Sequence, residues 1–482
     1  MKQIIQKYKN SPTPVKAAAW YTFCIFMQKL AAFLVIPFFT RILTTSEYGV
    51  YAVFLSWMSV FEIFATFKMY TNAFVAGLVR NETDMDRYTC SVQVTCLVTT
   101  GLVTGIAVLF IQHLSYITGL SVKLMLLMLL SFYPAATIGI WSAKQRVSNK
   151  YRMMVIVTFL YSVLAPIISI VAAYILPDKL ESAIMARVYV QFIIAIPFFL
   201  SNVFGLNKGV VLKYCKEILR YSIPLAPYFL SMVLLNSSDR IMIKSIIGES
   251  EAAMYSVAYS ISMAMFVFES ALNLALEPWL LSRIKRNDGN GVSKSITQAS
   301  CFIAILNVVI LVASPEIITI VASERYAEAV WSMPPVIGSL LIMFIYQQFL
   351  QVHFYYGENK VVFIASMLSA AMNILLNMYC LPRFGYIVAG YTTLTSYLLI
   401  AVIYYCSMVK VAQKHNLDHK SFYNISDLVK LVTIYFIISG VAMLLYQHIA
   451  IRYILVALTI AVLLIYKNKI VEYFKSKEMK LI

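Results

Sequence analysis

The chain has 482 residues, of which 61% are hydrophobic and 13% are charged, and its formal net charge at pH 7 is +17. Soluble globular domains carry a charged fraction of about 25%, so this composition excludes a water-soluble protein and indicates one that lies in a membrane.

Long apolar stretches recur along the whole chain. A membrane-spanning helix needs about 20 mainly apolar residues, and fourteen stretches meet this requirement. The connectors between them are too short to fold as separate soluble domains. In chain order the predicted spans are 17–40, 49–77, 89–112, 121–143, 153–176, 183–205, 223–247, 255–281, 296–322, 331–356, 361–381, 386–410, 427–448 and 451–467.

The basic residues predict the orientation of these spans. With the N-terminus inside, the inner connectors and termini hold 28 lysines and arginines and the outer connectors hold eight. Because positively charged loops stay on the cytoplasmic side, both termini are expected in the cytoplasm. The high net charge then reflects inner loops that face anionic headgroups, and no nucleic-acid partner is expected.

One connector separates the spans into two sets of six. Residues 206–222 alternate apolar and basic positions at helical spacing, which predicts an amphipathic helix at the membrane surface. A faint repeat supports two halves, because Glu47-Tyr-Gly-Val-Tyr51 after the first span resembles Glu251-Ala-Ala-Met-Tyr255 after the seventh. The predicted organisation is a six-helix half (1–205), the connector (206–222), a second half (223–410), a further connector (411–426), and a last helix pair with a basic tail (427–482).

Few ionisable residues fall within the predicted spans. Each costs about 2.5 to 3.5 kcal/mol at the bilayer centre on insertion scales, so each suggests either a function or a structural ion pair. The cations are Lys29, Lys68 and Arg240, and the acids are Glu62, Asp239, Glu269 and Glu277.

Polar uncharged residues form stripes on several predicted helices. Steps of four or seven residues return to the same helix face, so such a stripe could line a wet cavity or bond neighbouring helices. The predicted cavity-lining residues are Ser262, Asn273, Gln347, Gln351, Asn373 and Asn377. Separately, Gly101-Leu-Val-Thr-Gly105 predicts a close contact between helices within the fold.

Several chemical motifs are missing from the sequence. No GxxxxGK[ST] phosphate-binding loop, no HExxH motif and no other metal-ligand spacing occurs, so ATP-driven transport, metal binding and bound cofactors are not expected. No large outer loop with acidic clusters is present either, and we therefore do not expect an enzyme.

Four motifs resemble a known family. They are Pro37-Phe-Phe-Thr40-Arg41 with Glu47 to Tyr51, Tyr221-Ser-Ile-Pro224-Leu-Ala-Pro227 with Asp239-Arg240, the region around Tyr255, and the run from Asn373 to Gly390. In this order they resemble the polysaccharide transport (Wzx-type flippase) branch of the multidrug/oligosaccharidyl-lipid/polysaccharide exporter superfamily. One departure is Ala252-Ala253-Met254, where family members often have a glycine.

The resemblance implies an all-α polytopic fold with about 14 transmembrane helices, namely a MATE-like core of two six-helix halves plus two C-terminal helices. It implies a flippase that moves polyprenyl-diphosphate-linked oligosaccharide to the outer leaflet of a bacterial inner membrane, for capsule, O-antigen or similar polysaccharide, by alternating access. Lys29, Lys68 and Arg240 would then bind the diphosphate, and Glu62, Asp239, Glu269 or Glu277 would bind a coupling ion or form ion pairs.

The expected partners are membrane lipids and, from the same pathway, glycosyltransferases and a polymerase, with the protein itself a monomer. Two alternatives stay open. One is a cation-coupled multidrug exporter of the same fold, and the other is a membrane polysaccharide polymerase or ligase.

Overall fold

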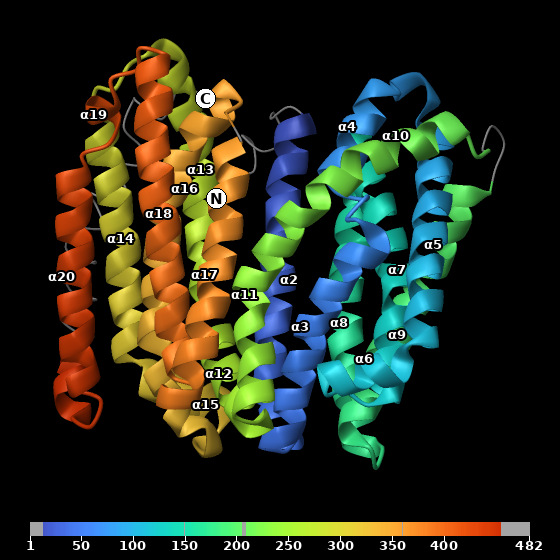
Figure 1. Ribbon diagram of the computed structural model, residues 1–482, viewed down its shortest axis with the longest axis horizontal. Coiled ribbons are helices and arrows are strands. Elements are labelled where there is room, and N and C mark those ends of the chain that lie inside the picture. Colours follow the sequence, from blue (N-terminus) through green and yellow to red (C-terminus); the bar gives the residue numbers. More distant parts are fainter. Residues whose placement is uncertain (1–12, 149, 205–208, 359, 455–482) are drawn as a thin grey trace, which may run out of the picture. The chain divides into compact units, whose positions relative to one another are not determined.

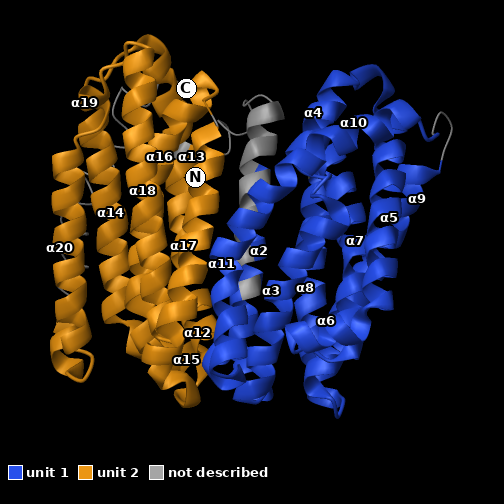
Figure 2. Cartoon of the chain, viewed as in Figure 1, with its two compact units in different colours: residues 1–253 blue, residues 254–482 orange. Residues whose placement is uncertain are grey.

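The structure is a computed structural model that describes residues 13–148, 150–204, 209–358 and 360–454, and every regular element in these ranges is a helix (Figure 1). The chain forms two compact units, residues 1–253 and 254–482 (Figure 2).

Unit 1 contains ten α-helices and the start of an eleventh within the described ranges. They are α2 (Thr13–Ile42), α3 (Thr45–Thr66), α4 (Asn72–Arg80), α5 (Met85–Leu109), α6 (Ile111–Thr118), α7 (Val122–Val147), α8 (Tyr151–Ile175), α9 (Lys179–Val203), α10 (Leu212–Ser222), α11 (Ala226–Ile246) and the first turn of α12 (Glu249–Ser262), with short 3-10 turns at η1 (Glu82–Asp84) and η2 (Ile223–Leu225).

Unit 2 continues from α12 through the 3-10 turn η3 (Met263–Met265). Its further elements are α13 (Phe266–Arg286), α14 (Val292–Val312), α15 (Ser314–Ala322), η4 (Glu324–Ser332), α16 (Met333–Tyr356), α17 (Lys360–Phe384), α18 (Val388–Lys414), α19 (His419–Phe422) and α20 (Ile425–Leu444). Almost all of α16 is buried, as expected for a helix that is apolar on every side.

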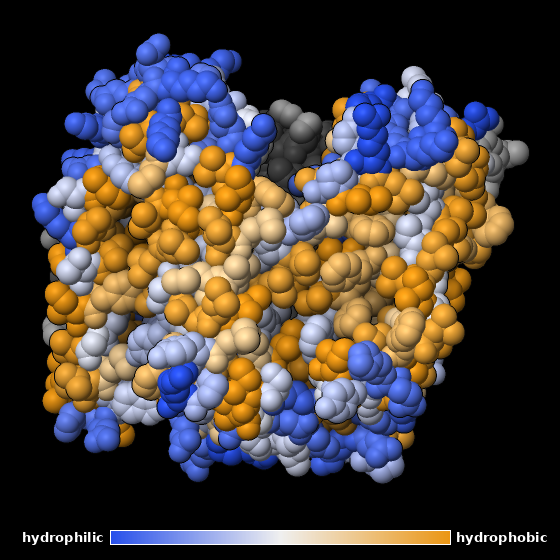
Figure 3. All heavy atoms as spheres, viewed as in Figure 1, coloured by the Kyte–Doolittle hydropathy of each residue, from blue (hydrophilic) through white to orange (hydrophobic). Residues whose placement is uncertain are grey.

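Twelve helical stretches of the described chain are long and apolar enough to cross a membrane. The predicted first span coincides with α2, of which Phe33–Ile42 is a shorter apolar helical segment. The predicted last span, 451–467, falls largely outside the described residues. In each unit, apolar side chains form a band between hydrophilic ends (Figure 3). A multi-pass membrane protein is therefore confirmed, while the number fourteen stays a prediction.

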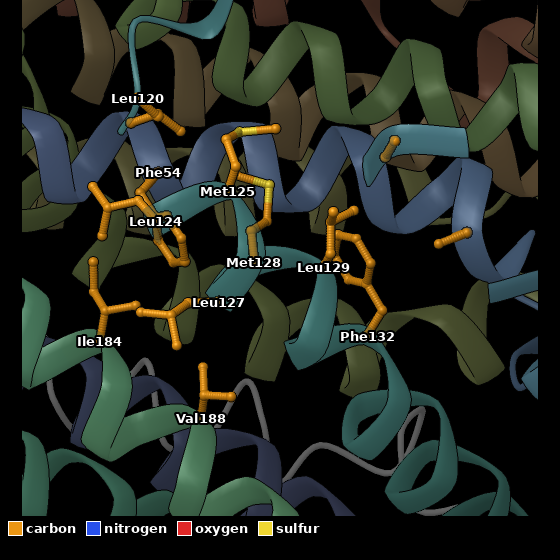
Figure 4. Close-up of a cluster of buried hydrophobic side chains, with 12 residues drawn as sticks. Phe54, Leu120, Leu124, Met125, Leu127, Met128, Leu129, Phe132, Ile184 and Val188 are labelled. Carbon is orange, nitrogen blue, oxygen red and sulfur yellow. The ribbon is translucent and has the colours of Figure 1, made fainter. Parts of the chain in front are cut away.

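The core of unit 1 is built where α3, α7 and α9 meet (Figure 4). On α7, Met125, Met128 and Phe132 lie three and four residues apart, which places them on one face of the helix. They pack with Phe54 of α3, and Ile184 of α9 belongs to the same buried cluster. This core holds the three helices that carry much of the polar site described below.

The second predicted span, 49–77, is not one continuous helix. α3 ends at Thr66 and α4 begins at Asn72, and Phe67 and Lys68 take left-handed φ angles of 46° and 48°. Neither residue is a glycine, so this conformation costs about 1–2 kcal/mol per residue. Threonine hydroxyls satisfy the freed backbone groups, because Thr71 Oγ1 donates to the Lys68 carbonyl at 2.7 Å and the Lys68 N–H donates to Thr66 Oγ1 at 3.2 Å.

The prediction of a close contact at Gly101 and Gly105 is wrong for the described chain. A Cβ atom added at Gly105 would meet no described atom within 4 Å, and at Gly101 it would meet only Tyr133 Oη at 3.9 Å. Leu102 and Ile106 beside them are exposed, so this face of α5 lies where lipid would cover it. Small residues permit close helix packing but do not by themselves bring a second helix there.

Candidate functional site

The break between α3 and α4 gathers three polar side chains. Lys68 Nζ lies 2.6 Å from Glu62 Oε2 and 3.1 Å from Tyr70 Oη, and the Tyr70 hydroxyl donates to the other oxygen of Glu62. A Cβ atom at Gly139 of α7 would come within 2.6 Å of the Tyr70 ring, so the ring packs closely on that helix. The Lys68 cation predicted from the sequence is thus neutralised by a neighbouring carboxylate.

Removing either charge of this pair is expected to destabilise the protein. Lys68→Met or Glu62→Gln should each cost on the order of 1–3 kcal/mol, less than for a fully buried pair because the two side chains stay 20% and 17% exposed. The double variant leaves no unpaired charge. The decrease in its unfolding temperature in detergent should therefore be smaller than the sum of the decreases in the two single variants. Strictly additive changes would contradict a coupled pair.

The starts of α3 and α12 form a second polar contact, here called the helix-start contact. Ser46 donates to the Glu249 carboxylate, and Thr45 Oγ1 lies 3.4 Å from Ser250 Oγ. A Cβ atom at Gly49 would lie far inside van der Waals distance of the Glu249 carbonyl oxygen and 2.8 Å from its carbonyl carbon. The part of α12 that belongs to unit 1, up to Ala253, therefore lies beside the start of α3.

Two further interactions hold the helix-start contact in place. Thr44 and Glu47 form a capping box, in which Thr44 N–H donates to Glu47 Oε2 at 2.8 Å and the Glu47 N–H donates to Thr44 Oγ1 at 3.2 Å. Lys244 Nζ lies 3.2 Å from Glu249 Oε1 and donates to the Gly119 carbonyl at 2.7 Å. Glu47, a residue of the family motif, thus has a structural role as a helix cap.

The other predicted ligands of the diphosphate are less fully described. Arg240 is half-buried in α11, Asp239 beside it is buried, and both interact with neighbouring residues. Lys29 lies in α2, but its side chain is outside the part of the chain whose side chains the structure describes.

In unit 2, Glu269 is the most unusual acid. Its side chain is 0% exposed, and neither carboxylate oxygen has a hydrogen-bond partner among the described residues. It lies in the first turn of α13, directly after the 3-10 turn η3 interrupts the helix. Tyr435 of α20 is close enough for the two groups to interact electrostatically. Glu277, further along α13, is only half-buried.

The predicted polar stripes of α13 and α16 bond to each other. Asn273 Nδ2 donates to Gln347 Oε1 at 2.6 Å, and Gln348 Nε2 donates to Asn273 Oδ1 at 2.6 Å. Gln351 is buried with its Oε1 unpartnered among the described residues, and Ser262 donates to the Ala258 carbonyl of its own helix at 2.8 Å. Most of these groups are thus already satisfied within the protein.

A similar ladder joins α17 to α18. Asn373 Nδ2 donates to Thr393 Oγ1 at 3.1 Å, Asn377 Nδ2 donates to Asn373 Oδ1 at 3.3 Å, and Thr392 Oγ1 donates to Asn377 Oδ1 at 2.5 Å. Both asparagines are fully buried. The polar residues of the Asn373–Gly390 motif therefore hold these two helices together.

One charged residue was missed as a site candidate from the sequence. Arg187 counts among the outer basic residues in the charge asymmetry, yet it lies two turns inside α9 and is half-buried, with Nη1 donating to Tyr51 Oη at 3.2 Å. The available signal was its position inside the predicted span 183–205.

Comparisons with known proteins place the chain in a family. Residues 15–285, more than half of the chain, match the family described as polysaccharide biosynthesis protein. An uncharacterised membrane protein of Methanocaldococcus jannaschii is 26% identical over 218 residues, which are 45% of this chain and 51% of that protein. The chain thus spans about half the length of this curated relative.

Solved structures show the same fold at low sequence identity. Lipid II flippase MurJ in an inward closed conformation has a TM-score of 0.70 at 14% identity, covering 93% of this chain and 99% of that one. A multidrug resistance MATE family transporter of the MOP superfamily, in its inward-facing conformation, has a TM-score of 0.67 at 13% identity, covering 81% and 96%. The chain is therefore a multi-pass membrane protein that belongs to the polysaccharide biosynthesis protein family and has the fold of the MurJ and MATE transporters.

Proposed function

We propose that the protein is a flippase that moves polyprenyl-diphosphate-linked oligosaccharide from the inner to the outer leaflet of a bacterial cytoplasmic membrane for surface polysaccharide synthesis. The observation that carries this proposal is the family match over residues 15–285. The fold shared with MurJ supports it, because that protein is a flippase of lipid II.

Cations within the spans give the proposal its chemistry. A diphosphate needs cationic partners where water is scarce, and a guanidinium fits its oxygens best. Arg240 and Lys29 are the proposed ligands. Lys68 could also bind the diphosphate only if its ion pair with Glu62 were broken, and Glu62 would then keep its hydrogen bond from Tyr70. Binding of cargo and loosening of the α3–α4 break are coupled in this scheme.

Glu269 is the proposed site of the coupling ion. An ionised carboxylate without a partner costs several kcal/mol in a protein interior, and Glu269 is buried with no hydrogen-bond partner among the described residues, so a bound proton would stabilise it. The proton is thus the coupling ion that this environment favours.

Flipping can be tested directly in proteoliposomes that contain a fluorescent polyprenyl-diphosphate oligosaccharide, with an external reductant reporting the accessible leaflet. The wild type should move the lipid, and Arg240→Glu should slow it by about tenfold or more, because the reversed charge repels the diphosphate. Arg383→Glu reverses an exposed charge at the end of α17 and serves as the matched control.

Two results would contradict the proposal. One is an Arg240→Glu protein that folds and flips at the wild-type rate. The other is a cell depleted of the protein in which lipid-linked repeat units accumulate on the outer leaflet, since the block would then lie after flipping. Export of cationic dyes without any movement of the lipid would favour the multidrug exporter instead.

A further inference from the structure

Arg187 and Arg452 are both counted among the basic residues of the outer connectors, and the structure places both at least partly inside the protein. They differ in whether their charge is neutralised. Arg452 is 2% exposed, and its Nη1 lies 2.6 Å from Glu316 Oε2, so its charge is neutralised. For Arg187, in contrast, no carboxylate in the described ranges forms an ion pair. Its contacts are the hydroxyls of Tyr51 on α3 and Tyr161 on α8.

The orientation of α9 places this guanidinium toward the interior of unit 1. Tyr189, Ile193 and Ile196 are all more than half exposed and form the face that lipid would cover. At 100° per residue, Arg187 and Gln191 lie one turn apart on the opposite side. The exposed part of the half-buried Arg187 side chain therefore belongs to the interior face, between α3, α8 and α9.

The surrounding groups are polar and held in place. Gln191 Nε2 donates to Tyr161 Oη at 2.6 Å, and its Oε1 is buried with no hydrogen-bond partner among the described residues. The Tyr51 ring packs edge-on against Phe39 of α2, with the ring centroids 5.1 Å apart. Arginine, two phenols and an amide from α3, α8 and α9 thus meet at one place.

Phenol hydroxyls do not neutralise a guanidinium. A charged residue in a span costs about 2.5–3.5 kcal/mol on insertion scales, and nothing described at this position compensates the charge. Guanidinium presents five N–H donors in a planar fork that fits carboxylate and phosphate oxygens, and tyrosine and glutamine can bond the hydroxyls beside such a group. We infer that Arg187, Tyr51, Tyr161 and Gln191 form a subsite for an oxyanion of the saccharide cargo.

This inference rests on the proposed function for the identity of the cargo. The oxyanion has two sources, the carboxylate of an acidic sugar and the diphosphate of the lipid link. They call for the same guanidinium chemistry at Arg187, and if the diphosphate is the source, Arg187 is a further ligand of it in addition to the residues proposed above.

The test is direct binding to the purified full-length protein in nanodiscs. The probes are a disaccharide containing glucuronate, the matching disaccharide with glucose, and inorganic pyrophosphate. We expect at least one anionic probe to bind more tightly than the neutral disaccharide. Arg187→Gln should weaken that binding by about tenfold or more, Arg187→Lys by less because it keeps the charge, and Tyr161→Phe by a few-fold.

The pattern of losses decides the source of the oxyanion. Loss of glucuronate binding alone assigns the site to an acidic sugar, and loss of pyrophosphate binding alone assigns it to the lipid link. If Arg187→Gln changes only the unfolding temperature and leaves both anions bound as in the wild type, the arginine is structural and the inference is wrong. Equal binding of the charged and neutral disaccharides, with no pyrophosphate binding, overturns it as well.

The flipping assay separates this inference from the proposed function. If the wild type flips the lipid and Arg187→Gln binds anions as tightly as the wild type does, only the subsite is refuted. If the wild type flips no lipid but binds an anion that Arg187→Gln no longer binds, the proposed cargo is refuted and the subsite stands. Tyr161→Phe removes one hydroxyl without changing charge, so it keeps the test valid if Arg187→Gln does not fold.

Discussion

A Glu269→Gln protein is expected to fold at least as well as the wild type, and its rate of gradient-driven transport is expected to fall by about tenfold or more. Glutamine has nearly the same volume as glutamate and stays neutral, so the buried site beside α20 keeps its packing and no longer needs a proton. If Glu269 carries the coupling proton, the variant cannot release it when the site opens to water.

The measurement is lipid movement in proteoliposomes with and without an imposed pH gradient. Glu277→Gln is the matched control, because it makes the same chemical change two turns along α13, where the side chain is half-buried. The wild type and the control should respond to the gradient, and Glu269→Gln should not. A Glu269→Gln protein that still accelerates with the gradient would remove Glu269 from the mechanism.

Replacing Gly49 with alanine is expected to have the largest effect on stability among single-methyl changes at the glycines of unit 1. The added Cβ would collide with the backbone carbonyl of Glu249, and a backbone atom cannot rotate away as a side chain can. Overpacking of this kind costs about 1–3 kcal/mol. The helix-start contact should separate, and with it the bond between Ser46 and Glu249.

Gly105→Ala provides the control for this experiment. A Cβ atom there meets no described atom within 4 Å, and alanine is favoured over glycine in a helix by about 0.5–1 kcal/mol. The unfolding temperature in detergent should fall for Gly49→Ala and stay level or rise for Gly105→Ala. In a Thr45→Cys/Ser250→Cys background, chosen because Thr45 Oγ1 lies 3.4 Å from Ser250 Oγ, the disulfide between the two introduced thiols should form less readily when Gly49→Ala is added. An unchanged unfolding temperature and cross-linking yield would show that the contact is not tightly packed.

The sequence carried the membrane assignment and the family, for a simple physical reason. A spanning helix satisfies its own backbone hydrogen bonds and meets lipid on its outside, so length and apolar composition suffice to find it. The twelve candidate spans of the described chain follow from that rule. The spacing of apolar and basic residues likewise predicts the amphipathic α10 within residues 206–222. The motifs around Glu47 and Asn373 pointed to the correct family because their capping and helix-bonding roles depend on local spacing.

Only the tertiary structure decided which charges and small residues have partners. The sequence predicted Lys68 as a ligand of the diphosphate and Glu62 as a coupling-ion or ion-pair residue, and the break at Phe67 and Lys68 turns the lysine back onto Glu62. Gly101 and Gly105 have the spacing of a helix contact, yet an added Cβ atom would meet only Tyr133 Oη at Gly101 and no described atom at Gly105, whereas Gly49, in no such pattern, touches Glu249. Whether a buried charge is neutralised depends on residues far away in the chain, and for that reason Arg187, Arg452 and Glu269 could be told apart only once the helices were packed.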